Sequence, residues 1–172
     1  MTNNSVKSHA KVNLNLNIIG KTKKFHKLQS IILLISLHDE ITLKQIKHRS
    51  HKILFKGEFS KKISSRNTIH KTLSILEKKK LLKKKYLVLI KKNIPSKSGM
   101  GGGSMNAATL IKILIKKKII KLDKKKLQNL CNSIGQDVKL GFFKNKMYLN
   151  SNNRVKTLNK MTKYFLLLFM PK

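Results

Sequence analysis

The sequence predicts a mixed α/β domain in which strands and helices surround a glycine-rich loop. Polar and apolar residues alternate over residues 11–19, which is typical of a strand with one buried face. The loop occupies residues 99–103. An apolar run precedes it, and apolar residues follow it at helical spacing. The chain has 172 residues, which is the size of one ordinary domain that can bury a core.

The first predicted element is the strand KVNLNLNII at residues 11–19. Its apolar residues are Val12, Leu14, Leu16 and Ile18, and they alternate with Asn13, Asn15 and Asn17. Neighbouring side chains of a strand point to opposite faces, so we expect the apolar face to lie in the core. The opposite face carries Lys11 together with Asn13, and it is either simply solvated or part of a site.

The glycine-rich loop lies between a second predicted strand, YLVLIKKNIP at residues 86–95, and a helix, NAATLIKILIKKK at residues 106–118. The helical spacing is that of Leu110, Ile111, Leu114 and Ile115. Glycine allows positive φ and close approach to the backbone, and amides at a helix N-terminus attract anions such as phosphate. The alternative is a flexible glycine linker, which the flanking strand and helix make less favourable.

Two better-known phosphate-binding motifs do not fit this loop. The Walker A motif requires Gly-Lys-Ser/Thr at the helix entrance, whereas this loop ends Gly103-Ser104-Met105. The dinucleotide motif G-x-G-x-x-G matches Gly99 and Gly101 but requires glycine where Ser104 stands.

Further elements are predicted after the loop. Residues 123–134 form a helical stretch, and a loop with Asp137 connects them to the apolar GFF at residues 141–143. Asp137 is one of only six carboxylates, which makes its place beside aromatic residues notable. YFLLLFM at residues 164–170 is predicted to be a buried strand, because its seven apolar residues are far fewer than the ~20 that a membrane helix requires.

The segment from Pro95 to Ala108 resembles the second motif of the GHMP kinases, the superfamily named for galactokinase, homoserine kinase, mevalonate kinase and phosphomevalonate kinase. Other segments resemble further motifs of that superfamily in the same order. They are AKVNLNLNIIG at residues 10–20, KFHKLQS at 24–30, more loosely NTIHKTLSIL at 67–76, and IGQDVKLGFF at 134–143. The triple glycine before Asn-Ala-Ala is most similar to one branch, the 4-diphosphocytidyl-2-C-methyl-D-erythritol kinases of the non-mevalonate isoprenoid pathway.

The resemblance implies a fold and a domain organisation. Residues 1–160 would be the N-terminal ATP-binding domain of a GHMP kinase, which is similar to the second domain of ribosomal protein S5. Residues 161–172 would start the crossover to a ferredoxin-like second domain that is missing from this chain. The chain is then a fragment, the product of a split gene or a degraded enzyme.

The resemblance also implies ATP-dependent phosphorylation of the 2-hydroxyl of 4-diphosphocytidyl-2-C-methyl-D-erythritol. Phosphoryl transfer needs a base, cations that offset charge and a cradle for the donor. Asp137 would be the catalytic base and Lys11 its cationic partner, while Asn13, Phe25 and His26 would bind the substrate, with its cytosine on the last two.

The implied ATP-binding residues are Pro95, Ser96, Lys97, Ser98, Gly99, Met100, Gly101, Gly102, Gly103, Ser104, Met105 and Asn106. The Ser104 hydroxyl would contact Mg²⁺ or phosphate, or would instead cap a helix that opens at Asn106. Three departures from the family pattern count against full activity: Lys139 replaces a proline, Met105 a serine and Lys24 a glycine.

The net charge is +34, which usually indicates nucleic acid or another anionic partner. Here the lysines run along the whole chain, without a localised basic patch and without the arginines and aromatics that base reading favours. An excess of Lys, Ile and Asn is typical of an AT-rich genome, so we expect only non-specific nucleic-acid binding. The alternatives are a basic RNA- or ribosome-associated protein on an S5-like fold and an inactive kinase remnant.

The remaining residues indicate the compartment. The single cysteine, Cys131, excludes an internal disulfide and fits a reducing environment. No long apolar stretch precedes the first motif, so we expect no targeting segment and a cytoplasmic protein of a bacterium or of an organelle of bacterial descent. A separately encoded C-terminal half is an expected partner, and a membrane is not.

No zinc site is expected from the remaining histidines, which we interpret as ordinary surface residues: His9, His38, His48, His51 and His70.

Overall fold

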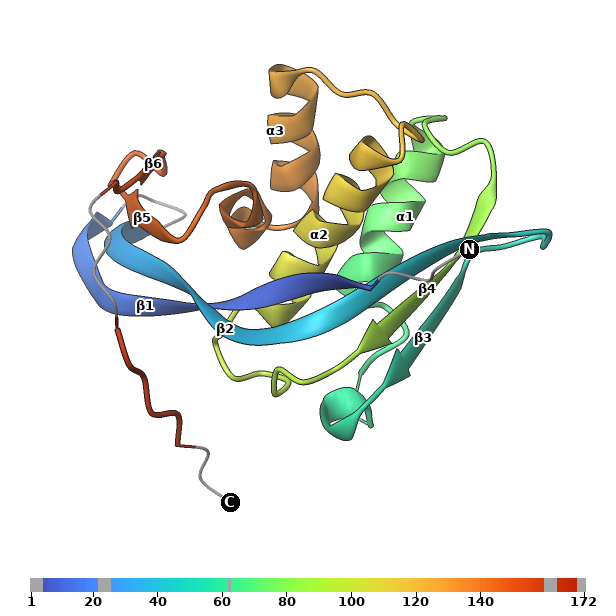
Figure 1. Cartoon of the computed structure of the whole chain (residues 1–172). Coiled ribbons are helices and arrows are strands. Elements are labelled where there is room, and N and C mark those ends of the chain that lie inside the picture. The colour runs from blue at the N-terminus through green and yellow to red at the C-terminus, as the bar shows by residue number, and fades with distance from the viewer. Residues whose placement is uncertain (1–4, 22–25, 62, 160–163, 170–172) are drawn as a thin grey trace.

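The computed structural model describes residues 5–21, 26–61, 63–159 and 164–169. Within them, a six-stranded sheet carries the α-helices on one of its faces (Figure 1), as the predicted mixed α/β class requires. The strands are β1 (Val6–Lys21), β2 (His26–Ile46), β3 (Lys52–Lys56), β4 (Lys85–Lys91), β5 (Lys146–Leu149) and β6 (Val155–Thr157). The helices are α1 (Thr68–Lys78), α2 (Gly102–Lys116) and α3 (Lys124–Ile134), with two 3-10 helices, η1 (Glu58–Ser60) and η2 (Gln136–Phe142).

Strand β2 is the central strand of the sheet. It pairs antiparallel with β1 along most of its length, with β4 near its C-terminal end and with β5 near its N-terminal end. The sheet order is β3-β4-β2-β5-β6, with β1 on the other edge of β2, and β3 runs parallel to β4.

Helix α2 lies at the centre of the core. Its residues from Met105 to Ile111 are all buried, between α1 on one side and η2 on the other. Ile41, Val88 and Ile90 of the sheet complete the same apolar cluster. A helix that is apolar around most of its circumference is stable only when it is enclosed in this way.

The helix N-termini differ in how they are capped. The side chains of Asn67 and Asp123 accept hydrogen bonds from first-turn amides of α1 and α3. Helix α2 instead follows Gly101, at φ 68, and has no side-chain cap. Because α2 begins at Gly102, Ser104 lies inside its first turn, and the predicted cap of a helix opening at Asn106 is wrong.

Other predicted elements are confirmed in place. The helix over residues 123–134 is α3 with its cap, and the strand predicted at residues 86–95 is β4, which ends at Lys91. Asp137 lies in the 3-10 helix η2 and not in an irregular loop. None of the helices formed by the described residues is long and apolar enough to cross a membrane.

Strand β1 exists as predicted, but its apolar face is not in the core. Leu14, Leu16 and Ile18 are exposed, the last with 65% of its surface. The strands β1 and β2 extend beyond the helices (Figure 1), so this part of β1 has no helix to pack against. Bulges between His9 and Lys11 and between Asn13 and Asn15 also interrupt the simple alternation of faces.

The prediction of a buried strand at residues 164–170 is also wrong for the part that the structure describes. Residues 164–169 form no strand, and Phe165, Leu167 and Phe169 are 97%, 79% and 85% exposed. The less exposed residues, Tyr164, Leu166 and Leu168, border a hollow beside residues 33–37 of β2. One side of the segment therefore faces this hollow and is less exposed, and the other side is open.

His51 is not the surface residue that the sequence indicated. Its side chain is 8% exposed, its ring is stacked on that of Tyr86, and its Nδ1 accepts a hydrogen bond from the Tyr86 amide. Burial lowers the pKa of this imidazole.

We expect Gly141→Ala to destabilise the fold, because the new Cβ would lie 2.4 Å from the Ala108 Cβ of α2. Overpacking of this kind costs about 1–3 kcal/mol in the free energy of unfolding, measurable by urea denaturation. Gly20→Ala is the matched control, since its new Cβ would meet only the Lys27 Cδ, at an ordinary contact distance of 3.7 Å. Equal stability of the two variants would contradict the close packing of η2 on α2.

Candidate functional site

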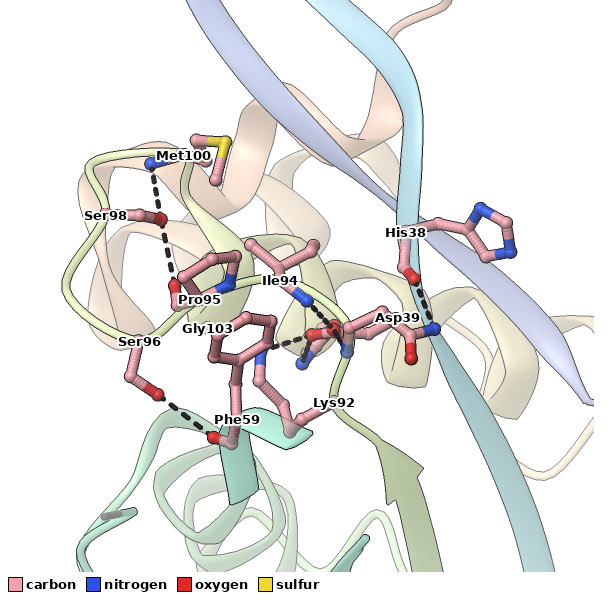
Figure 2. A network of polar contacts seen from close by, with 12 residues as sticks. His38, Asp39, Phe59, Lys92, Ile94, Pro95, Ser96, Ser98, Met100 and Gly103 are labelled. Carbon is pink, nitrogen blue, oxygen red and sulfur yellow. Dashed lines mark hydrogen bonds and ion pairs between the residues drawn. The ribbon is translucent and has the colours of Figure 1, made fainter. Parts of the chain in front are cut away.

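The glycine-rich loop borders a cavity of about 310 Å³ between the end of β4 and the start of α2. Figure 2 shows the loop turning from Pro95 through Ser98 to Met100, with the Ser98 hydroxyl donating to the Pro95 carbonyl at 2.8 Å. Of the residues predicted to bind the nucleotide, those that line the cavity are Pro95, Ser96, Lys97, Ser98, Gly99, Gly101, Gly102, Gly103, Ser104 and Asn106.

The other two predicted loop residues face elsewhere. Met105 is buried in a second apolar cluster with Ile32, Leu140 and Met147. Met100 does not line the cavity, and its carbonyl accepts a hydrogen bond from the Lys11 amide at 3.0 Å. Met105, which replaces a serine of the family motif, is therefore a core residue.

Three successive glycines allow side chains from other elements to pack closely against the loop backbone. A Cβ on Gly101 would lie 2.9 Å from the Lys11 stem, and one on Gly102 would lie 3.2 Å from both Ile94 and the Lys92 amine. A Cβ on Gly103 would lie 3.0 Å from the Thr68 hydroxyl. Gly99 and Gly101 also have positive φ, which favours glycine at both positions.

The N-terminus of α2 carries partial positive charge toward this cavity. Its first amides have no side-chain cap, and the helix dipole adds to their polarity. Backbone amides arranged in this way are suited to hold an anion such as a phosphate group.

A chain of polar contacts leads from the loop to Asp137. The Lys11 stem packs on Gly101, and its Nζ lies 3.6 Å from Oδ2 of Asp137. The same Nζ donates to Oδ1 of Asn13 at 2.8 Å, and Asn13 donates to the Ser30 hydroxyl at 2.6 Å. Lys11 is largely buried whereas the Asp137 side chain is 46% exposed, so the carboxylate is accessible and the cation is fixed.

Asp137 borders a second cavity of about 400 Å³, together with Lys27 and Lys139. The Lys139 amine donates to the Asn153 carbonyl at 2.6 Å. Burial lowers the pKa of Lys139, while the negative charge of Asp137 opposes that shift. Lys11 contacts one lining residue of each cavity, Gly101 with its stem and Asp137 with its ammonium group.

This arrangement combines an anion cradle, a fixed cation and an accessible carboxylate. Such groups can hold a phosphorylated donor, offset charge and accept a proton from a hydroxyl group. The structure thus brings together Lys11, Asn13, Asp137 and most of the predicted loop. Phe25 lies outside the described residues, and so does the side chain of His26.

Three residues that sequence reasoning missed also belong to the site: Asp39, Thr68 and Lys92. Thr68 lines the first cavity and donates to the Gly103 carbonyl at 2.8 Å. Lys92 could not be distinguished among so many lysines. Asp39 carried the same signal as Asp137, because both belong to the few carboxylates of the chain.

The two lysine-rich segments meet far from this site. The exposed lysines lie at and after the end of α1 (Lys78, Lys79, Lys80, Lys83 and Lys84) and from the end of α2 into the first turn of α3 (Lys116, Lys117, Lys118, Lys121, Lys124, Lys125 and Lys126). Lys79, Lys121 and Lys126 border one hollow. This patch lies at the C-terminal end of α2, about 20 Å along the helix from the glycine loop.

Comparison with known proteins gives a consistent result. Residues 67–143 match the family model described as "GHMP kinases N terminal domain". The chain is 46% identical to the 4-diphosphocytidyl-2-C-methyl-D-erythritol kinase of Pelagibacter ubique (strain HTCC1062), over 99% of the chain and 61% of that protein. It is 33% identical to the protein of the same name from Fusobacterium nucleatum, over 95% of the chain and 57% of that protein.

Solved structures share the fold. The crystal structure of 4-(cytidine 5'-diphospho)-2C-methyl-D-erythritol kinase matches with a TM-score of 0.73 at 24% identity, over 90% of this chain and 55% of that one. Mevalonate kinase from methicillin-resistant Staphylococcus aureus MRSA252 matches with a TM-score of 0.61 at 13% identity, over 92% of this chain and 56% of that one. The chain spans 55–61% of the length of these relatives.

Proposed function

We propose that this chain is the nucleotide-binding part of a GHMP kinase, an enzyme that phosphorylates the 2-hydroxyl of 4-diphosphocytidyl-2-C-methyl-D-erythritol with ATP. The observation that carries the proposal is the contact chain in which Lys11 packs on Gly101 and pairs with Asp137. The substrate is taken from the names of the relatives that are 46% and 33% identical.

The loop cavity fits a nucleotide phosphate chain, because glycine backbone lines it and the first amides of α2 have no side-chain cap. ATP, when bound, supplies the phosphoryl group. The loop from Pro95 to Ser104 and Asn106 would hold that donor, with Met100 and Met105 acting only through the backbone and the core.

Asp137 accepts the proton of the acceptor hydroxyl in this proposal. Its carboxylate is accessible from the second cavity, and the acceptor would bind there. By the family resemblance, Asn13, Phe25 and His26 would contact the acceptor as well. Lys11 holds a positive charge between this base and the loop. This charge offsets the negative charge that develops on the transferred phosphoryl group.

Magnesium would be held chiefly by the nucleotide. Among the described residues, no group of three or more His, Cys, Asp or Glu side chains could hold a metal ion. Mg²⁺ commonly binds through substrate phosphates and waters with one or two protein ligands. Ser104, which lines the loop cavity, is the ligand that we propose.

A second domain is the remaining part of the proposal. Residues 1–160 would form the ATP-binding domain and residues 161–172 the start of the crossover, with the other half supplied by continuing chain or by a separate protein. Its support is the partial coverage of the relatives and the open apolar side of residues 164–169. We place the assembled enzyme in the cytoplasm of a bacterium or of an organelle of bacterial descent.

We expect Gly102→Val to abolish ATP binding measured by calorimetry with Mg²⁺ present. The new side chain would press on Ile94 and the Lys92 amine and would enter the phosphate cavity. Gly20→Val, on β1, is the control and should bind ATP like the unchanged chain. Equal ATP affinity of all three proteins would remove the loop from the proposal.

We expect Asp137→Asn to lower kcat by about 10²- to 10⁴-fold once the second domain is supplied, with little change in substrate binding. The amide keeps the size of the carboxylate but cannot take the proton. Lys11→Met should also lower kcat, and the double variant should lose less than the product of the two effects. Asp123→Asn is the control, because asparagine caps a helix as well as aspartate does. An undiminished kcat in Asp137→Asn would show that another group is the base.

We expect the C-terminal part of the Pelagibacter ubique relative, produced separately, to bind this chain in analytical ultracentrifugation. Phe165→Ser with Phe169→Ser should weaken that binding at least about tenfold, because buried aromatic anchors carry much of an interface's affinity. Leu54→Ser, at an exposed apolar residue of β3, should leave it unchanged. Binding that ignores both phenylalanines would mean that another surface receives the second domain.

A further inference from the structure

Asp39 is a fully buried carboxylate that lies behind the glycine loop and plays no part in the chemistry above. Figure 2 shows the groups that converge on it. Its Oδ1 accepts hydrogen bonds from the backbone amides of Asn93 and Ile94, both at 2.8 Å. Its Oδ2 accepts from the Asn106 side chain at 2.8 Å and from the Lys92 ammonium group.

These partners flank the loop on both sides. Asn93 and Ile94 lead directly into Pro95, and Asn106 lies in α2, two residues after Ser104. Asn93 is tied to β2 a second time, since its side chain donates to the His38 carbonyl at 2.9 Å. One carboxylate on the central strand therefore fixes the entry and the exit of the loop relative to each other.

The fourth partner places a cation at the phosphate cavity. Lys92 is 5% exposed, lines the cavity, and its amine lies 3.2 Å from the position that a Cβ of Gly102 would take. The ammonium group thus sits against the first residue of α2. The ion pair with Asp39 holds the ammonium group there, because a buried charge needs an oppositely charged partner.

Stability alone accounts poorly for this pair. Removing two charges from water is costly, and apolar residues of similar size are often as stabilising as a buried ion pair. The same pair is useful if it fixes the position of groups that hold a reacting molecule, because a small displacement of such groups lowers the reaction rate steeply. Polar groups of both loop ends and one cation meet here on a single carboxylate.

We propose that Asp39 is a positioning residue for the nucleotide: it sets the spacing of the two loop ends and holds the Lys92 ammonium group at the phosphate cavity. The inference rests on the proposed ATP binding of this chain. Asp39 itself touches no nucleotide, and it acts through Lys92, Ile94 and Asn106.

The test is calorimetric titration of ATP with Mg²⁺ into the unchanged chain, Asp39→Asn and Glu40→Gln, at a temperature where thermal melting shows each to be folded. Glu40 is the matched control, because this neighbouring carboxylate pairs with Lys91 and accepts a hydrogen bond from the Ser5 hydroxyl, both outside the loop. We expect the dissociation constant of Asp39→Asn to rise at least about tenfold, and that of Glu40→Gln to change less than twofold. An Asp39→Asn chain with unchanged ATP affinity overturns the inference, and so does an equal loss in Glu40→Gln.

A second variant covers the case in which Asp39→Asn does not fold with Lys92 left unpaired. The double variant Asp39→Asn with Lys92→Met contains neither buried charge, so we expect its melting temperature to return toward that of the unchanged chain while ATP binding stays weak. Recovery of ATP affinity together with stability would reduce Asp39 to a structural role and overturn the inference. If the unchanged chain itself binds no ATP, the proposed function fails first, which keeps the two failures distinguishable.

Discussion

The burial of helix α2 is the constraint on which the rest of the structure depends. Its side chains from Met105 to Ile111 are enclosed on all sides, so each neighbouring element must approach its backbone closely. Small residues permit that approach, as Gly141 does against Ala108 and Gly101 does against Lys11. The first contact brings η2, and with it Asp137, to the N-terminal half of α2. The second brings β1 and its Lys11 to the same place, and the site forms where these contacts meet.

Charge is distributed unevenly around this helix. The N-terminal end of α2 faces two aspartates with lysine partners, Asp39 with Lys92 and Asp137 with Lys11. The C-terminal end is surrounded by exposed lysines, which the helix dipole favours at that end. One group of exposed lysines thus lies away from the candidate site, whereas Asp39 and Asp137 each pair with one lysine within it. The two aspartates differ in burial: Asp39 is inaccessible and organises the loop, whereas Asp137 is open to an acceptor.

The sheet extends beyond the helices that cover it. Exposed Leu16 and Ile18 lie on that part of β1, and Phe165 and Phe169 lie on the extended segment near the C-terminus. Apolar surface of this kind commonly marks an interaction site. The groups placed by α2 and by Asp39 are in contrast enclosed within the described residues, so the nucleotide half of the proposed site is built by this domain itself.

The sequence by itself determined the local features of this protein. The glycine loop between a strand and a helix, the α3 helix capped at Asp123, and the shared face of Lys11 and Asn13 all follow from patterns within a few residues, because φ preferences and side-chain periodicity are local properties. Tertiary structure alone decided which of the apolar faces found a partner, and so Leu14 and Leu16 are exposed despite a regular alternation. It also decided that Lys92 and Asp39, 53 positions apart, form one buried pair, since a lysine among forty basic residues carries no local mark of the contact that it will make.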